Sequence, residues 1–242
     1  MSMTSNVKIY HGKNYLLKIV YEDENIIILE KPAGILTHYA EDQPRTTLTT
    51  LVNKYLYDTQ KSMNFHAKCC HRLDYNTSGL VIFAKNEDAL YAMKEIFKNH
   101  GIKKYYRCVV KGLLIPREAE LHHFHAMGPN YRAIIYDSMV PNSTEIITRY
   151  KVLNTRKKMS LLEVELITGK THQIRAHLAH IGFPIVGDKK YGDYAFNKRL
   201  NTYIQALRAF RIEFDFDSGK GSIFNYLNGK KFEISNNLAI KI

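Results

Sequence analysis

The chain has 242 residues, of which 45% are hydrophobic and 24% are charged, and this composition excludes an intrinsically disordered protein. A balance of 35 basic to 23 acidic side chains gives a net charge of +12, spread along the chain; this indicates a folded basic surface for a polyanionic partner, or a solubility feature. No segment reaches the ~20 apolar residues of a membrane span, and three cysteines, two of them adjacent, exclude a disulfide framework and predict a reducing compartment, the cytoplasm.

The apolar pattern predicts the elements in chain order. Strands are predicted at 16–21, 26–30, 79–84, 104–112, 131–137, 145–153, 160–167, 209–216 and 231–235. Helices are predicted from Thr47, from the cap Asn86 to Gly101, and from Thr171 to Gly182. Because the strands outnumber the helices and mostly follow one another directly, the pattern favours an α+β fold with an antiparallel or mixed sheet over a doubly wound parallel sheet.

Residues 71–86 carry the strongest chemical signal, because Asp74 lies between the basic pair His71-Arg72 and a polar turn that leads into an apolar strand. An aspartate beside positive charge stays ionised, as a nucleophile or a salt-bridge anchor must be. The structural alternative is a turn aspartate paired with Arg72.

Two further residues have a chemical interpretation. Arg175, near the start of a predicted helix, can offer a carboxylate a bidentate partner that is always charged, and could meet Asp74. Tyr106, on a predicted strand, can stack on an extruded base or move a proton. The structural alternatives are a surface arginine and one more core tyrosine among the 17 in the chain.

Four ordered segments together resemble the RluA-like family of RNA pseudouridine synthases. They are the aspartate segment 71–86, the early loop 31–38, the strand 104–112, and the stretch that begins at Thr168 and runs through Gly187-Asp188 to Tyr191-Gly192. The resemblance implies isomerisation of uridine to pseudouridine in structured RNA, ribosomal or transfer, without a cofactor or a metal. It also implies the catalytic fold of that family, a long bent antiparallel or mixed sheet with flanking helices.

The resemblance assigns roles to single residues. Asp74 would attack a flipped uridine, either at the uracil ring or at the anomeric carbon, while Tyr106 would stack on the base and Arg175 would orient Asp74. RNA contacts would come from His71, Arg72, Lys170, His172 and Gln173. Three positions depart from the common pattern of relatives, since lysine stands at Lys170 for arginine, and Phe183 and Arg208 stand where histidine is usual.

We expect residues 20–242 to form the catalytic domain, with residues 1–19 as an N-terminal extension that leaves no room for the small RNA-binding domain of many relatives. We expect a monomer that binds RNA and no membrane. A protein of the same fold that binds RNA or assists ribosome assembly without catalysis is the competing interpretation. The presence of Asp74, Tyr106 and Arg175 together argues against it.

Histidines and cysteines gather in three places, at 66–71, 122–125 and 172–180. None of these groups contains paired Cys-x2-Cys or His-Glu-x-x-His, and adjacent residues seldom bind one metal well, so no metal site is predicted. The glycine-rich loops that bind nucleotide triphosphates or dinucleotides are missing as well, so no nucleotide cofactor is predicted.

Overall fold

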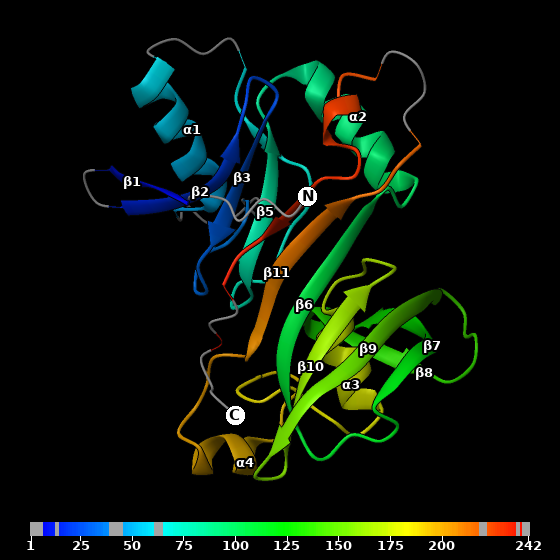
Figure 1. Cartoon of the computed structure of the whole chain (residues 1–242). Helices are drawn as coiled ribbons and strands as arrows, with labels where there is room; N and C mark the ends of the chain where they lie inside the picture. The colour runs from blue at the N-terminus through cyan, green and yellow to red at the C-terminus, as the bar shows by residue number, and fades with distance from the viewer. Residues whose placement is uncertain are drawn as a thin grey trace. The chain divides into compact units, whose positions relative to one another are not determined.

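The computed structural model describes residues 7–12, 15–38, 46–60, 65–217, 222–235 and 238. The chain forms two compact units (Figure 1). The first consists of residues 1–103 and 210–235, and the second of residues 104–209 and 236–242.

The first unit is an antiparallel sheet with two main helices. Its strands are β1 (Lys8–Gly12), β2 (Tyr15–Glu22), β3 (Ile26–Lys31), the short β4 (Lys68–Cys69), β5 (Ser78–Ala84), β11 (Leu207–Phe214), which begins in the second unit, and β12 (Lys231–Glu233). The order β1-β2-β3-β5 is antiparallel throughout, and β12 pairs with β11. Helix α1 (Leu48–Gln60) packs against β2 and α2 (Glu87–Lys98) against β5, and a short 3-10 turn lies at Asn225–Leu227.

Burial explains why these segments form these elements. β3 begins with four consecutive apolar residues that are completely buried, and the last five residues of β5 are completely buried too. Such unbroken apolar runs are typical of central strands covered on both faces. Asn86 caps α2, because its side chain accepts a hydrogen bond from the Ala89 backbone N–H at 2.8 Å.

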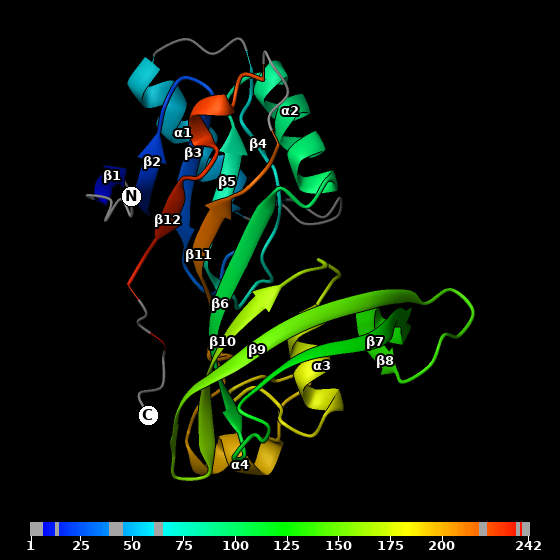
Figure 2. The same ribbon diagram turned by 45° about the vertical axis from the view of Figure 1, so that its right-hand side comes forward.

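The second unit is also an antiparallel sheet, in the order β6-β10-β9-β7-β8 (Figure 2). Its strands are β6 (Ile102–Lys111), β7 (Glu118–Gly128), β8 (Arg132–Tyr136), β9 (Thr144–Arg156) and β10 (Met159–Leu166). Helix α3 (Gln173–His180) packs against β8 and β9, a 3-10 turn at Pro129–Tyr131 joins β7 to β8, and α4 is short (Tyr194–Arg199).

The predicted α+β class is confirmed, and every predicted strand and helix is present with shifts of a few residues at its ends. Sequence analysis missed β1, the two-residue β4, β7 and α4. β7 carries alternating charged residues and three histidines in place of β-branched residues, so it lacks a strand signal. Helix α4 is too short for a periodic pattern and depends on Asp193, whose side chain accepts from the Phe196 N–H. Among the described residues, no helix has both the length and the apolar character needed to cross a bilayer.

Candidate active site

Asp74 lies on the loop between β4 and β5, and this loop is tied to the early loop that follows β3. The buried hydroxyl of Thr37 donates to the carbonyl of Leu73 at 3.0 Å and accepts from its N–H at 3.2 Å. The Gly34 N–H donates to the carbonyl of Tyr75 at 2.9 Å, and a turn is closed by the Thr77 N–H on the carbonyl of Asp74 at 3.0 Å. The backbone is therefore fixed on both sides of Asp74, whose side chain is half-buried.

His71 and Arg72 precede Asp74 in different environments. The His71 ring lies against Phe97 of α2, with centroids 5.2 Å apart, and its Nε2 accepts the Ile82 N–H at 3.2 Å. Arg72 is exposed. Thus Arg72 presents its charge to solvent beside the aspartate, while His71 connects the loop to the sheet and to α2.

Lys31, at the end of β3, is a completely buried lysine beneath the Asp74 loop. Its ammonium donates to the carbonyls of Pro32, Ile35 and Tyr75 at 3.0, 2.8 and 3.1 Å. Burial lowers the pKa of Lys31 to about 8, against the opposing effect of the Asp74 charge. The side chain is therefore mostly protonated at pH 7, which gives it one donor for each of the three carbonyls.

We expect Lys31→Met to lower kcat by about 10- to 100-fold with little change in KM, because the loop under Asp74 would shift and small misplacements of a reacting group are costly. Lys68→Met replaces an exposed lysine of β4 and is the matched control, with kcat close to that of the wild type. Steady-state kinetics of the two folded variants would check this. Equal kcat values for both would show that Lys31 does not position the loop.

Tyr106 is a buried residue of β6 and lies opposite Val164 in the ladder with β10. Both strands belong to the second unit, as does Arg175. Asp74 belongs to the first unit, so its relation to Tyr106 and Arg175 stays a prediction.

Arg175, on α3, is held by a buried aspartate that sequence analysis did not single out. Its Nε donates to Asp188 Oδ2 at 2.7 Å and its Nη2 to Oδ1 at 2.9 Å, while the guanidinium lies 5.1 Å from the centroid of the Tyr191 ring. Burial alone would raise the pKa of Asp188, but hydrogen bonds from Arg175 and from the N–H groups of Lys190 and Tyr191 lower it below its usual value. Both partners are therefore charged at neutral pH, in a geometry that fixes the direction of the guanidinium.

The segment between β10 and α3 contains the other predicted RNA contacts. Gln173 is buried, and its amide donates to the Ile147 carbonyl and to the Thr148 hydroxyl, each at 3.0 Å. Its carbonyl oxygen accepts from the Thr168 hydroxyl and the Lys170 N–H, also at 3.0 Å each. Gln173 is thus occupied within the protein, and it holds the loop in a shape that leaves Lys170 exposed.

His172 stands at the start of α3 in a left-handed backbone conformation, with φ of 57°. Its Nδ1 lies 2.9 Å from the Tyr191 hydroxyl, which in turn accepts the Ala133 N–H at 2.8 Å. Because the hydroxyl oxygen accepts from Ala133, its proton is available to His172 Nδ1. Tyr191 therefore contacts both Arg175 and His172.

Sequence analysis assigned no role to three residues of the site, Asp188, Tyr191 and Lys31. All three lie within the family-like segments. The signal for Asp188 was the pair Gly187-Asp188. Gly187 has φ of 79°, and a Cβ there would lie 2.1 Å from the Ile204 carbonyl oxygen, so the turn that presents Asp188 requires glycine.

Comparison with known proteins identifies the family. The family model described as RNA pseudouridylate synthase matches residues 25–180. An uncharacterized RNA pseudouridine synthase of Mycoplasma genitalium is 33% identical over 231 residues, covering 93% of this chain and 68% of that protein. The ribosomal large subunit pseudouridine synthase D of Borreliella burgdorferi is 31% identical over 235 residues. The match covers 93% of this chain and 68% of the length of that protein.

The fold agrees with this match. The human RNA pseudouridylate synthase domain containing 1 superposes with a TM-score of 0.69 at 23% identity, covering 87% of this chain and 83% of that chain. The chain spans 57% to 68% of the length of the first curated relatives that it matches. The motifs, the fold and the family match together show that this chain belongs to the RNA pseudouridylate synthase family, with the RluA-like relatives that its motifs predicted.

Proposed function

We propose that this protein isomerises specific uridines to pseudouridine in structured RNA, either ribosomal or transfer RNA. The observation that carries the proposal is the loop of Asp74, fixed on both sides by Thr37, Gly34 and Lys31 in a chain of this family. A carboxylate on a loop whose backbone is held in one place is suited to act as a nucleophile. Two relatives are named ribosomal large subunit pseudouridine synthase D, and these names favour ribosomal RNA as the substrate.

In the proposed reaction, the carboxylate of Asp74 attacks a uridine that has flipped out of the RNA. The attack takes place either at the uracil ring or at the anomeric carbon. In either route the bond between the ribose and uracil nitrogen 1 breaks, the base turns, and a bond to carbon 5 replaces it. Carbon 5 gives up its hydrogen as a proton to solvent and nitrogen 1 takes up a proton, so the composition is unchanged and the isomerisation needs no redox cofactor.

Two residues of the second unit complete the proposed chemistry. Tyr106 stacks on the flipped base and takes the proton from carbon 5. Arg175 orients and charge-balances Asp74. Asp188 accepts from Nε and Nη2 of the guanidinium and so fixes the direction of Arg175 for this role.

The remaining assignments concern RNA binding. Arg72, with His71 behind it, supports base flipping. The exposed Lys170 contacts backbone phosphate, His172 lies beside it, and Gln173 acts by holding the loop of both.

We further propose that residues 20–242 work as one catalytic domain with residues 1–19 as its extension, as a cytoplasmic monomer whose reaction needs neither cofactor nor metal. The three cysteines, Cys69, Cys70 and Cys108, are free thiols, which supports a reducing compartment.

Mapping of pseudouridines tests the proposal in cells with and without the gene. We expect one or a few positions in ribosomal or transfer RNA to lose pseudouridine in the deletion and to regain it when the wild-type gene is restored. Restoration by an Asp74→Asn gene would contradict the proposal.

RNA binding should weaken steeply with salt, since each lysine or arginine contact to phosphate releases counterions, with a slope of roughly −0.7 to −0.9 in log affinity against log salt per phosphate. We expect several phosphates to be engaged, so raising salt from ~50 to ~200 mM should cost at least about tenfold in affinity. Lys170→Gln should make the slope shallower by about one phosphate, whereas Tyr106→Leu should leave it unchanged because stacking releases no counterions. Fluorescence anisotropy with a labelled stem-loop measures all three proteins, and a flat salt response would exclude the basic surface as the binding face.

A further inference from the structure

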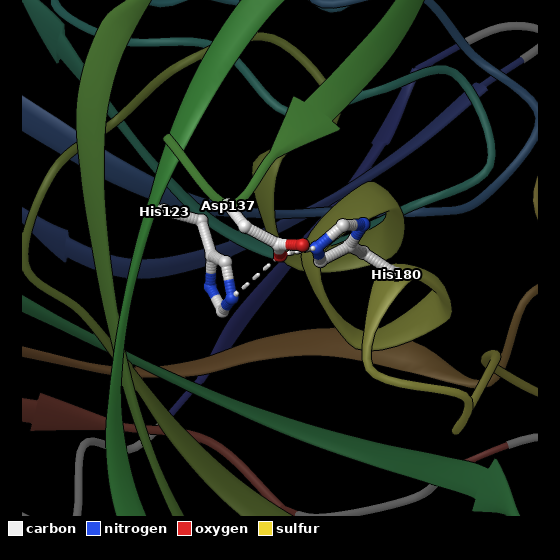
Figure 3. A group of neighbouring side chains, drawn as sticks. All are labelled: His123, Asp137 and His180. Carbon is white, nitrogen blue, oxygen red and sulfur yellow. Dashed lines mark hydrogen bonds and ion pairs between the residues drawn. The ribbon is translucent and has the colours of Figure 1, made fainter. Parts of the chain in front are cut away.

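Three side chains from separate elements of the second unit converge at one end of α3 (Figure 3). His123 comes from β7, Asp137 follows β8, and His180 is the last residue of α3. Asp137 Oδ1 lies 2.7 Å from His180 Nε2 and 3.5 Å from His123 Nε2. One ligand atom of each residue lies within 4.8 Å of the other two. The two imidazoles thus point at one carboxylate from different sides.

We propose that His123, Asp137 and His180 form a binding site for a divalent transition metal, with Zn²⁺ as its preferred ion. Imidazole nitrogen and aspartate oxygen bind zinc at about 2.0–2.2 Å, which places neighbouring ligand atoms of a tetrahedral site roughly 3.3 Å apart. The separations of 2.7 and 3.5 Å to Asp137 lie on either side of that value. Small rotations of side chains would therefore complete the geometry, without movement of the backbone.

The surroundings of His123 orient it as a ligand. Its Nδ1 lies 2.8 Å from Nε2 of the completely buried His177, whose Nδ1 lies 2.9 Å from the Thr148 hydroxyl. If His177 carries its proton on Nδ1, its Nε2 accepts from Nδ1 of His123, which leaves the Nε2 lone pair of His123 directed at Asp137. A hydrogen bond to the second ring nitrogen is the usual way in which proteins fix the tautomer of a metal-binding histidine.

Access and the open coordination position also fit a metal ion. The Asp137 side chain is 83% exposed and that of His180 26%, so an ion can enter from solvent and keep water as a fourth ligand. Without a metal, an exposed carboxylate between two histidines contributes little to stability. In this location a metal would join the C-terminal end of α3 to β7 and to the end of β8. The ion would have a structural role, because none of the three ligands is among the residues proposed to act on uridine.

Zinc titration of the whole protein tests the site, after EDTA treatment and desalting. By calorimetry we expect the wild type to bind zinc with micromolar affinity, and Asp137→Asn and His180→Ala each to bind at this site at least about tenfold more weakly. His122→Ala is the matched control, because His122 is the neighbouring residue on β7 and contacts Glu120 and Glu145 instead. A second control, Cys69→Ser/Cys70→Ser, removes the adjacent thiols, and both controls should keep the site. Equal zinc binding by the wild type and the two site variants, or no binding by the wild type, would overturn the proposal.

NMR of the histidine side chains gives a readout that does not depend on a variant. On addition of zinc, the Nε2 resonances of His123 and His180 should shift to those of a coordinated nitrogen, and His123 should carry its proton on Nδ1. Unchanged Nε2 resonances at a stoichiometric excess of zinc would overturn the assignment. Neither experiment involves RNA, so its result is independent of the proposed activity.

Discussion

Asp74→Asn should abolish pseudouridine formation, with a loss of about 10⁴-fold or more, the scale on which enzymes lose turnover with their nucleophile. The amide has almost the shape of the carboxylate but cannot attack uridine. The hydrogen bonds that hold this loop run through the side chains of Thr37 and Lys31 and through the backbone at Leu73 and Tyr75. We therefore expect the variant to keep its fold and most of its RNA affinity, as measured by circular dichroism and by anisotropy with a labelled stem-loop.

The matched control for this variant is Asp58→Asn, which makes the same change on α1, where Asp58 accepts from the Tyr10 hydroxyl at 3.2 Å. It should keep the activity of the wild type. Turnover by Asp74→Asn within about tenfold of wild type, or 1.4 kcal/mol in activation free energy, would rule out Asp74 as the nucleophile.

Arg175→Lys should lower kcat by at least about 100-fold although it keeps the positive charge. Arg175 donates to Asp188 through Nε and Nη2, at 2.7 and 2.9 Å, and in our proposal the guanidinium also orients Asp74. An ammonium offers one nitrogen on a flexible stem and cannot reproduce this fork. The loss should appear in kcat and less in KM, because the residue positions Asp74 and does not carry the affinity for RNA.

Arg132→Lys provides the control on the same aromatic ring, since its guanidinium lies 4.8 Å from the Tyr191 centroid but its side chain is exposed. Its kcat should remain close to that of the wild type.

Asp188→Asn would leave the Arg175 charge buried with a weaker partner, and it should destabilise the fold by about 3–5 kcal/mol in chemical denaturation. Full activity of Arg175→Lys would remove this arginine from the account of Asp74.

The sequence predicted the elements whose burial follows a simple period. β3 and β5 each contain an unbroken apolar run, and α1 and α2 have one apolar face each, so local pattern and tertiary position agree. β7 was missed because it contains two glutamates and three histidines and no β-branched residue, and its pairing with β8 and β9 comes from partners elsewhere in the chain. No local pattern contains that information.

The same reason explains which parts of the site were found. Asp74, Tyr106 and Arg175 were recognised because they lie in family-like segments, yet the buried lysine beneath Asp74 and the aspartate that holds Arg175 required the structure. Lys31 looked like a loop residue, and its three carbonyl partners depend on how two loops meet. The histidines were compared with metal motifs by their spacing along the chain. The group of His123, Asp137 and His180 draws on β7, the end of β8 and α3, so spacing could not reveal it.

Release of tritium from RNA labelled at carbon 5 of uracil tests the central claim most directly, because this hydrogen leaves when carbon 5 becomes the new point of attachment. The purified protein should release tritium from its substrate RNA over repeated turnovers, before and after EDTA treatment, and Asp74→Asn should release none above background. Tight RNA binding without tritium release from total ribosomal and transfer RNA of the deletion strain would contradict the account and identify a protein of this fold that binds RNA without catalysis.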